Sequence, residues 1–298
     1  MAISLALLGN GASGTALSVV PALRRGRPGP RVSLFALATS IAMLGSLVLT
    51  NQLPFDSFAI AWDRNQVLYL ALMYLALAAP FFTGALAVGW LVSTRPDDTP
   101  RVYAANLVGS SAGCLLALGA LATVGGDRAA LIAAWLAGLA ALAARVETPP
   151  ARRGLLATAS ALLVAIVLLG CLVAPPEIVS MRLSPYKSLS QTLRAPQSEL
   201  VWTRWDAAER VDLVHSPTIR TFPGLSYAYT GPLPTQDGLT FDGDDLSPIT
   251  HITAESAGFS EYMPGAAAEL LRPGSSVLVL GARGGLDAVA ALANGAAQ

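Results

Sequence analysis

Long apolar stretches separated by short polar loops fill the first 174 residues of the chain. A helix that crosses the hydrocarbon core of a bilayer needs about 20 apolar residues. Six stretches come close to this length and contain no Asp, Glu, Lys, Arg or His: residues 3–20, 32–50, 67–92, 102–124, 129–144 and 155–174. The pattern predicts a polytopic α-helical membrane domain of about six transmembrane helices over residues 1–174.

Proline and glycine within these stretches bear on how the helices pack. Pro80 lies in the 26-residue third stretch, which is too short for two crossings, so we expect it to kink one helix. Gly9 and Gly11, like Gly109 and Gly113, are spaced so that helix backbones can approach closely. We interpret this spacing as helix packing, and it is compatible with a homo-oligomer.

The pattern changes after Pro176, where short alternating or β-branched runs are interrupted by Pro, Gly and Asp. Residues 199–205, 210–215 and 239–241 are predicted strands, and residues 241–245 a turn. A helix is predicted over residues 260–271, followed by an apolar strand over 277–280. We therefore expect a small β-rich segment over residues 175–258, followed by the start of a Rossmann-like α/β domain over residues 259–298.

Composition narrows the functional classes. Hydrophobic residues make up 53% of the chain and charged residues 13%, against roughly 25% charged in an ordinary soluble domain. The formal net charge is zero, and no basic run with interleaved aromatics occurs in the soluble part. We therefore expect the lipid bilayer as a partner and no nucleic acid. Cys114 and Cys171 both lie in apolar stretches and are interpreted as packing residues.

The apolar stretches also bear on a transport function. Ion-coupled carriers usually hold ionisable residues at depth in the membrane, and these stretches have none. A membrane transporter or a scaffold protein with a regulatory soluble tail is therefore the less favoured alternative.

A glycine turn follows the predicted strand at 277–280. It contains Gly281, Gly284 and Gly285, and Asp287 stands in the first turn of the helix expected to begin near Leu286. Without Cβ atoms, such a turn lets backbone amides and a helix N-terminus face an anionic or polar ligand. The alternative is a tight strand-to-helix turn without a ligand, in which Asp287 only caps the helix.

The order of these features resembles membrane-fused spermidine synthase-like proteins, which are polyamine aminopropyltransferases within the class I S-adenosylmethionine-dependent transferases. After the apolar stretches, the similarity is carried by Ser184-Pro185-Tyr186-Lys187, Phe241-Asp242-Gly243, Glu261-Tyr262-Met263 and the run from Val277 to Asp287. The stretches around residues 2–14 and 103–109 are also similar to the membrane region of such proteins. The resemblance covers nearly the whole chain.

The resemblance implies a Rossmann-like fold that binds S-adenosylmethionine or decarboxylated S-adenosylmethionine, with aminopropyl or methyl transfer to a small-molecule amine or other acceptor. It assigns cofactor binding to Gly281, Gly284, Gly285 and Asp287, and substrate binding to Asp242 and Tyr262. The catalytic acids and the acid that holds the ribose would lie beyond Gln298, so the catalytic residues are unknown. The printed chain is expected to be an inactive fragment truncated at the C-terminus.

One departure from the family concerns the glycine turn. Arg283 stands where glycine is usual, so its side chain is expected to crowd the adenosyl group.

Arginines in the loops conflict with the side of the membrane that such a cofactor requires. The first, third and fifth loops are richer in arginine than the second and fourth, which offer Arg64 and Arg128. The positive-inside rule then places the soluble part outside after six crossings. Because the cofactor is cytosolic, we instead expect an integral protein of the cell (inner) membrane with a cytoplasmic soluble domain. A cytoplasmic soluble domain then requires that one of the predicted helices, at 129–144 or 3–20, does not cross the membrane, or that the positive-inside rule does not apply to this chain.

The remaining polar clusters predict no metal site. His215 and His251 are 36 residues apart, and no Cys or acid cluster supplies metal-ligand spacing. The acids at 242, 244 and 245 lack the ligand periodicity of a calcium loop and are interpreted as a solvated turn.

Overall fold

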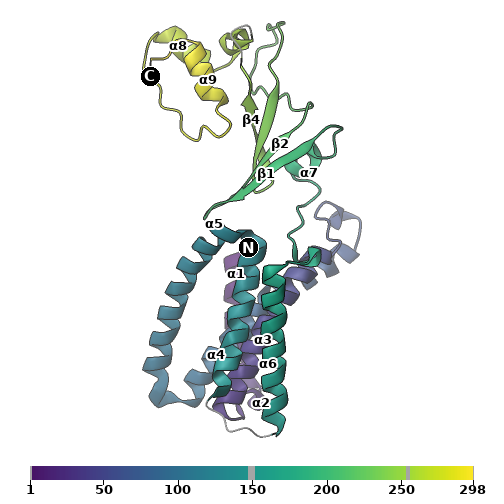
Figure 1. The fold of residues 1–298 in the computed structure, drawn as a ribbon, viewed down its shortest axis with the longest axis vertical. Coiled ribbons are helices and arrows are strands. Elements are labelled where there is room, and N and C mark those ends of the chain that lie inside the picture. The colour runs from purple at the N-terminus through teal and green to yellow at the C-terminus, as the bar shows by residue number, and fades with distance from the viewer. Residues whose placement is uncertain (1, 147–151, 253–255, 298) are drawn as a thin grey trace. The chain divides into compact units, whose positions relative to one another are not determined.

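The chain divides into two compact units, Met1–Arg182 and Leu183–Gln298. A computed structural model of the protein describes residues 2–146, 152–252 and 256–297 (Figure 1). The first unit is helical, and the second contains the antiparallel sheet.

All six apolar stretches form helix in the first unit. Gly125, with φ 79°, interrupts the 48-residue helix α5, so the fourth and fifth stretches are separate helical segments. Only glycine adopts this backbone conformation readily. Pro80 lies inside α4, which continues through it. The helices are α1 (Ala2–Val19), α2 (Pro21–Arg24), α3 (Pro28–Gln52), α4 (Asn65–Thr94), α5 (Thr99–Val146) and α6 (Arg152–Val173), with short 3₁₀ turns η1 (Ala59–Ala61), η2 (Pro96–Asp98) and η3 (Glu177–Val179).

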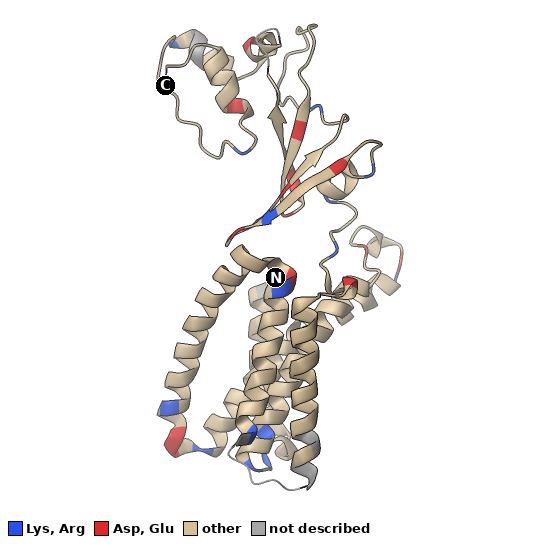
Figure 2. Ribbon diagram, in the orientation of Figure 1, with Lys and Arg blue, Asp and Glu red and all other residues tan. Residues whose placement is uncertain are grey.

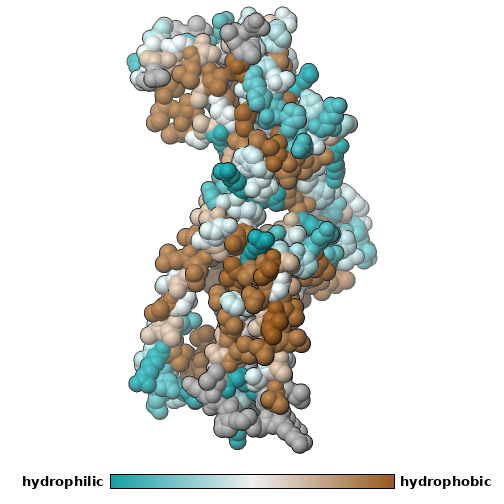
Figure 3. Space-filling model, viewed as in Figure 1, coloured by the Kyte–Doolittle hydropathy of each residue, from teal (hydrophilic) through white to brown (hydrophobic). Residues whose placement is uncertain are grey.

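The helices are apolar on their outer surface. Among the described residues, three helical runs are long and apolar enough to cross a membrane: Pro28–Gln52, Asn65–Thr94 and Pro96–Arg145. Ile3–Val19 and Thr158–Val173 are apolar but shorter. Apolar residues cover much of the visible face of this unit (Figure 3), which is compatible with membrane association.

Small residues and one large aromatic hold the helices together. A Cβ on Gly9 would lie 2.8 Å from the carbonyl oxygen of Ala78, so α1 and α4 touch backbone to backbone there. Trp90 is 1% exposed and packs with Leu17 and Phe35. In contrast, a Cβ on Gly109 would meet no atom within 4 Å. The expected role of glycine in close helix packing is therefore confirmed for Gly9, whereas Gly109 makes no such contact within this chain.

Two hydrogen bonds hold the segment after α6, at residues 180–181, against one end of the helical unit. The Asn51 Nδ2 donates to the Ser180 carbonyl over 3.0 Å, and the Met181 N–H donates to Asp127 Oδ1 over 2.9 Å. The exit therefore lies beside the second and fourth loops. Basic residues gather at the opposite end, which carries α2 (Figure 2).

The second unit is built on a four-stranded antiparallel sheet in the order β1-β2-β3-β4. Asp242 (φ 52°) and Gly243 (φ 72°) form the tight turn between β3 and β4, and an Asp-Gly pair with two positive φ angles is typical of a two-residue hairpin turn. Pro248 lies in β4, which is an edge strand and tolerates a residue without an N–H. The strands are β1 (Glu199–Trp205), β2 (Arg210–His215), β3 (Gln236–Phe241) and β4 (Asp244–Thr250).

One face of the sheet is covered by the short helix α7 (Ser188–Thr192). Val214 of β2 is fully buried there against Leu189 and Ile219. Asp212 lies two residues before Val214, on the same face, and is also fully buried. The sheet is therefore a packed scaffold, with a charged residue inside it.

Pro264 divides the predicted helix over 260–271. The structure has a 3₁₀ segment, η4 (Ala257–Tyr262), followed by α8 (Ala266–Leu271). Met263 is extended (φ −91°, ψ 153°), as expected for a residue that precedes proline. The prediction of one continuous helix is therefore wrong.

The predicted strand over 277–280 is also not formed. An isolated parallel bridge joins Ser276 to Ala297, whereas Leu278 and Leu280 are 82% and 84% exposed. A strand requires a hydrogen-bonded neighbour along its length, and within the described residues this segment has only the bridge. The helix expected near Leu286 is present as α9 (Leu286–Ala293).

Candidate functional site

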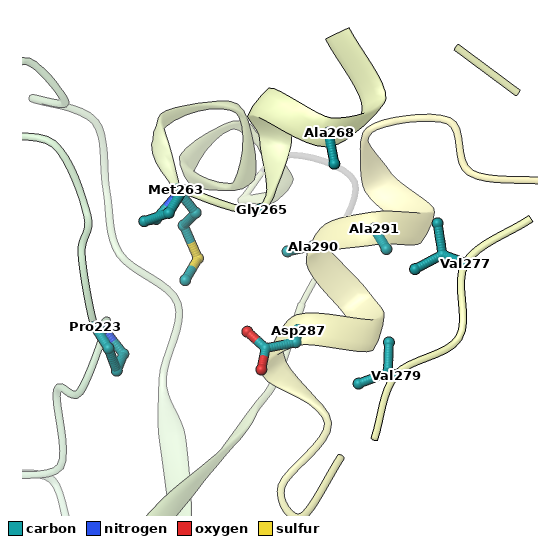
Figure 4. Close-up of a pocket in the computed structure, with 10 residues that line it drawn as sticks. Pro223, Met263, Gly265, Ala268, Val277, Val279, Asp287, Ala290 and Ala291 are labelled. Carbon is teal, nitrogen blue, oxygen red and sulfur yellow. The ribbon is translucent and has the colours of Figure 1, made fainter. Parts of the chain in front are cut away.

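A small cavity of about 260 Å³ lies in the second unit, between α9 and the segments that precede it. Its walls come from the loop at Pro223, the corner at Met263, the extended segment at Val277 and Val279, and α9 at Asp287 and Ala291 (Figure 4). Cavities that bind small molecules usually measure roughly 300 to 1,000 Å³. The cavity is therefore large enough for part of a nucleoside-sized ligand.

Asp287 supplies the charge of this mostly apolar cavity. It stands in the first turn of α9, two residues after Gly285, whose φ of 83° ends the glycine turn. Its carboxylate points from α9 toward the Met263 side (Figure 4). An acid at this position is favoured by the helix dipole and also faces the cavity, so its position fits both helix capping and ligand binding.

Aromatic packing fixes α9 against η4. Phe259 is fully buried and forms one cluster with Met263, Leu286 and Ala290. The rings of Phe222 and Phe259 meet edge to face, with centroids 5.1 Å apart. The walls of the cavity that come from α9 and the Met263 corner therefore rest on a packed support.

The three glycines of the turn differ in what surrounds them. The Gly284 N–H donates to Ser247 Oγ over 3.1 Å, and a Cβ on Gly284 would lie 2.1 Å from the Pro248 carbonyl oxygen. Gly285 forms an isolated bridge with Ile249. Gly281, with φ 68°, has open space where a Cβ would be. Gly284 and Gly285 thus dock the turn on β4. The Gly284 N–H is engaged at the sheet, whereas the Gly285 N–H donates to the Ala282 carbonyl within the turn.

Arg283 turns toward the sheet. Its guanidinium forms an ion pair with Asp245 and lies 5.1 Å from the ring centroid of Phe241. Arg283 has a φ of 46°, a backbone conformation that is uncommon for a residue with a Cβ. The cavity walls do not include it. Opposite charge and an aromatic face thus hold the Arg283 side chain away from this cavity, and its effect on an adenosyl group stays a prediction.

The two expected substrate residues lie in different surroundings. Tyr262 lines an open groove that shares Met263 and Pro264 with the cavity, and its ring centroid is 5.3 Å from that of Tyr229. Asp242 lies in the β3–β4 turn, where its Oδ1 accepts from the Arg210 N–H over 3.0 Å. Asp242 lines neither hollow. Tyr262 and Asp287 thus line two adjoining hollows, whereas Asp242 is engaged in the hairpin.

Two histidines distant in sequence share one carboxylate on the sheet. His215 Nδ1 lies 2.6 Å from Asp237 Oδ1, and His251 Nε2 lies 2.8 Å from Asp237 Oδ2. Burial raises the pKa of Asp237, but hydrogen bonds from both imidazoles outweigh this effect and hold the pKa below its ordinary value. Each ring faces a different oxygen, and no group of three or more His, Cys, Asp or Glu side chains in the described parts of the chain is arranged to hold a metal ion.

Sequence reasoning missed most of the cavity wall and the shared carboxylate. Pro223 comes from an irregular loop, and nothing in its neighbourhood predicts contact with α9. The histidine cluster had only a partial signal. The Asp-Gly turn predicts that β4 pairs with β3, but a register shift between Leu239 and Phe241 decides that Asp237 pairs with Ile249 and so lies near position 251.

Comparisons of the sequence with protein-family models, with curated proteins and with solved structures find no match.

Proposed function

We propose that this chain is a membrane-anchored, spermidine synthase-like transferase that binds S-adenosylmethionine or its decarboxylated form. The observation that carries the proposal is the position of Asp287, which follows a glycine turn and faces a cavity walled by the extended segment 277–279. A carboxylate after a glycine turn can accept hydrogen bonds from ligand hydroxyls or face a positively charged sulfonium.

The path of the chain around α9 supports a Rossmann-like start. The extended residues at 276–280 lead through the glycine turn into α9, and the chain then returns so that Ala297 bridges Ser276 in parallel. The Ala297 N–H donates to the Ser275 carbonyl over 3.0 Å. Two parallel segments joined by a helix are the basic unit of a nucleotide-binding α/β fold.

The residues around the cavity fit part of such a cofactor. Val277 and Val279 offer apolar walls for a purine, and the Met263 side chain borders the same space. When bound, the cofactor would supply an electrophilic carbon next to its sulfonium for transfer to an amine. The groove beside Tyr262 adjoins the cavity at Met263 and Pro264 and would hold the acceptor. In this proposal Asp287 orients the cofactor.

The helical unit anchors the transferase in the membrane. All six apolar stretches are helical, and the break at Gly125 separates the fourth from the fifth. We infer six crossings from this pattern. Because S-adenosyl cofactors are cytosolic, the proposal assigns unit 2 to the cytoplasmic side of the cell (inner) membrane. That side conflicts with the arginine-rich loops at the α2 end.

Calorimetric titration of the full chain in detergent tests the cofactor proposal. S-adenosylmethionine, its decarboxylated form and S-adenosylhomocysteine are the titrants. Ala291→Phe should abolish binding, because Ala291 lines the cavity and a phenyl ring would fill it. Ala293→Phe is the matched control, because Ala293 lies on the same helix but outside the cavity wall.

The wild-type chain and Ala293→Phe should give saturable heats with at least one titrant, whereas Ala291→Phe should give none. If the wild-type chain binds none of the three, the cofactor assignment is wrong, and a scaffold or transporter with a regulatory tail becomes the better interpretation.

A further inference from the structure

The loop between α3 and α4, residues 53–64, exposes large apolar side chains. Trp62 is 75% exposed, Phe58 62% and Ile60 38%. The three positions flank or lie within the 3₁₀ turn η1 and are spaced two residues apart. Large apolar side chains that are exposed together usually mark a surface that contacts a membrane or a partner.

Asp56 and Asp63 of the same loop are bonded within it or to the start of α4. The Phe58 N–H donates to Asp56 Oδ1 over 2.9 Å, and the Asn65 N–H donates to Asp63 Oδ1 over 3.0 Å. Gln66 is 6% exposed. Its Oε1 accepts from the Asp56 N–H over 2.8 Å, and its Nε2 donates to Asp63 Oδ2 over 2.9 Å.

These bonds give the loop a defined conformation. The acids and the glutamine bond to backbone or to each other at the base of the loop, at the start of α4. The backbone N–H groups and the Gln66 amide bonded in this way lose little when the loop leaves water. Phe58, Ile60 and Trp62 are therefore exposed on a loop whose base is held in place by hydrogen bonds.

We propose that residues 53–64 form an interfacial anchor, in which Phe58, Ile60 and Trp62 insert at the boundary between lipid headgroups and acyl chains. The loop joins α3 and α4, the first two runs that are long and apolar enough to cross a membrane, so its base stands where such helices end. Tryptophan is enriched at this depth because its ring is apolar while its N–H can bond to water or headgroups.

Site-directed labelling in nanodiscs holding one chain each tests the anchor. Cys114 and Cys171 are first replaced by serine, and an environment-sensitive NBD group is attached to a cysteine introduced by Trp62→Cys. Asp97→Cys, in the exposed loop between α4 and α5, is the aqueous reference. Leu75→Cys, which is 67% exposed on α4, is the reference for the acyl region. Phe58→Cys repeats the measurement if the label at position 62 disturbs folding.

The anchor predicts that NBD at position 62 emits to the blue of position 97. It also predicts stronger quenching by a nitroxide placed near the headgroup than by one deep in the acyl chain, with the opposite order at position 75. Emission at positions 62 and 58 equal to that at position 97 would overturn the anchor, even if position 75 reports lipid. A blue shift that occurs only in discs with two chains would overturn it in favour of contact with a second copy.

Discussion

Asp212 is a fully buried carboxylate in the middle of β2, and its two oxygens have different surroundings. Oδ1 accepts from Arg210 Nη2 over 2.7 Å and from Thr203 Oγ1 over 2.6 Å. Oδ2 has no partner among the described residues, and neither has the hydroxyl of Thr240, which stands opposite Asp212 in the β2–β3 ladder. Asp212 and Thr240 therefore place three buried oxygen atoms side by side, of which Asp212 Oδ1 is hydrogen-bonded and Asp212 Oδ2 and Thr240 Oγ1 are not.

Replacing Asp212 with alanine should destabilise unit 2 strongly. The substitution leaves the Arg210 guanidinium, whose side chain is 16% exposed, without its partner, and breaking a buried pair in this way costs about 3–5 kcal/mol. Thr240→Val is the control, because it removes a hydroxyl that has no partner in the described structure. It should leave stability equal or higher, within about 1 kcal/mol. Pulse proteolysis in urea on the full chain measures both, and equal losses in the two variants would refute this account.

The strands show how far sequence patterns predict individual elements. Short alternating or β-branched runs between turn residues identified β1 and β2 at their observed bounds. Burial alternates along β2, whereas β1 is exposed on both faces up to Trp205. β4 was missed because Pro248 and three acids of the 242–245 region hide its alternation, although the preceding Asp-Gly turn announces a hairpin. The helix expected over 260–271 failed at Pro264, a break that is visible in the sequence.

The site was predicted less well than the elements, because contacts between distant segments decide it. Asp287 faces the cavity because η4 and the loop at Pro223 fold against α9. Gly284 instead packs on β4, where its N–H donates a hydrogen bond to Ser247 Oγ. The local sequence pattern cannot predict which of the two residues faces the cavity and which contacts the sheet, since both belong to the same short turn.

The Asp237 carboxylate on β3 contacts His215 on β2 and His251 just after β4. The stability of unit 2 should therefore depend on pH in the acid range. Because the pKa of Asp237 is lowered in the folded protein, its contribution to stability is present above the unfolded pKa and is lost as the pH falls through the folded pKa. Wild-type unit 2 should therefore lose stability below about pH 4. Asp237→Asn should be less stable than wild type at neutral pH and show a smaller loss on acidification.

Urea midpoints between pH 3 and pH 7, measured for both proteins, test this dependence. Parallel pH profiles for the two would show that the contacts of Asp237 with His215 and His251 do not contribute to folding stability.

At the scale of the whole molecule, the count of crossings and the side of unit 2 are linked. The chain leaves the helical unit beside the second and fourth loops, through Asn51 and Asp127. Six crossings require unit 2 to lie on the same side as those loops. The apolar stretches predicted the helices, but charge alone could not fix the side of unit 2, because the arginine distribution and the side required by the proposed cofactor disagree.

Thiol accessibility in intact cells tests this link. In a background without Cys114 and Cys171, we expect Tyr227→Cys in unit 2 and Arg128→Cys in the fourth loop to react from the same side, and Asp97→Cys from the other. Tyr227 is fully exposed and Arg128 and Asp97 are also exposed. Protection of Tyr227→Cys and Arg128→Cys from an impermeant reagent would support a cytoplasmic unit 2. Reaction of Tyr227→Cys and Asp97→Cys from one side would contradict six crossings.

The most direct measurement on the central claim is ultraviolet cross-linking of radiolabelled S-adenosylmethionine to the full chain, followed by mapping of the labelled peptide. A cofactor bound in the cavity should label residues within 277–291, where Val277, Val279 and Asp287 line the cavity. Excess S-adenosylhomocysteine should remove the label, and Ala291→Phe should prevent it. Absence of competable label, or label confined to residues 1–182, would contradict the account.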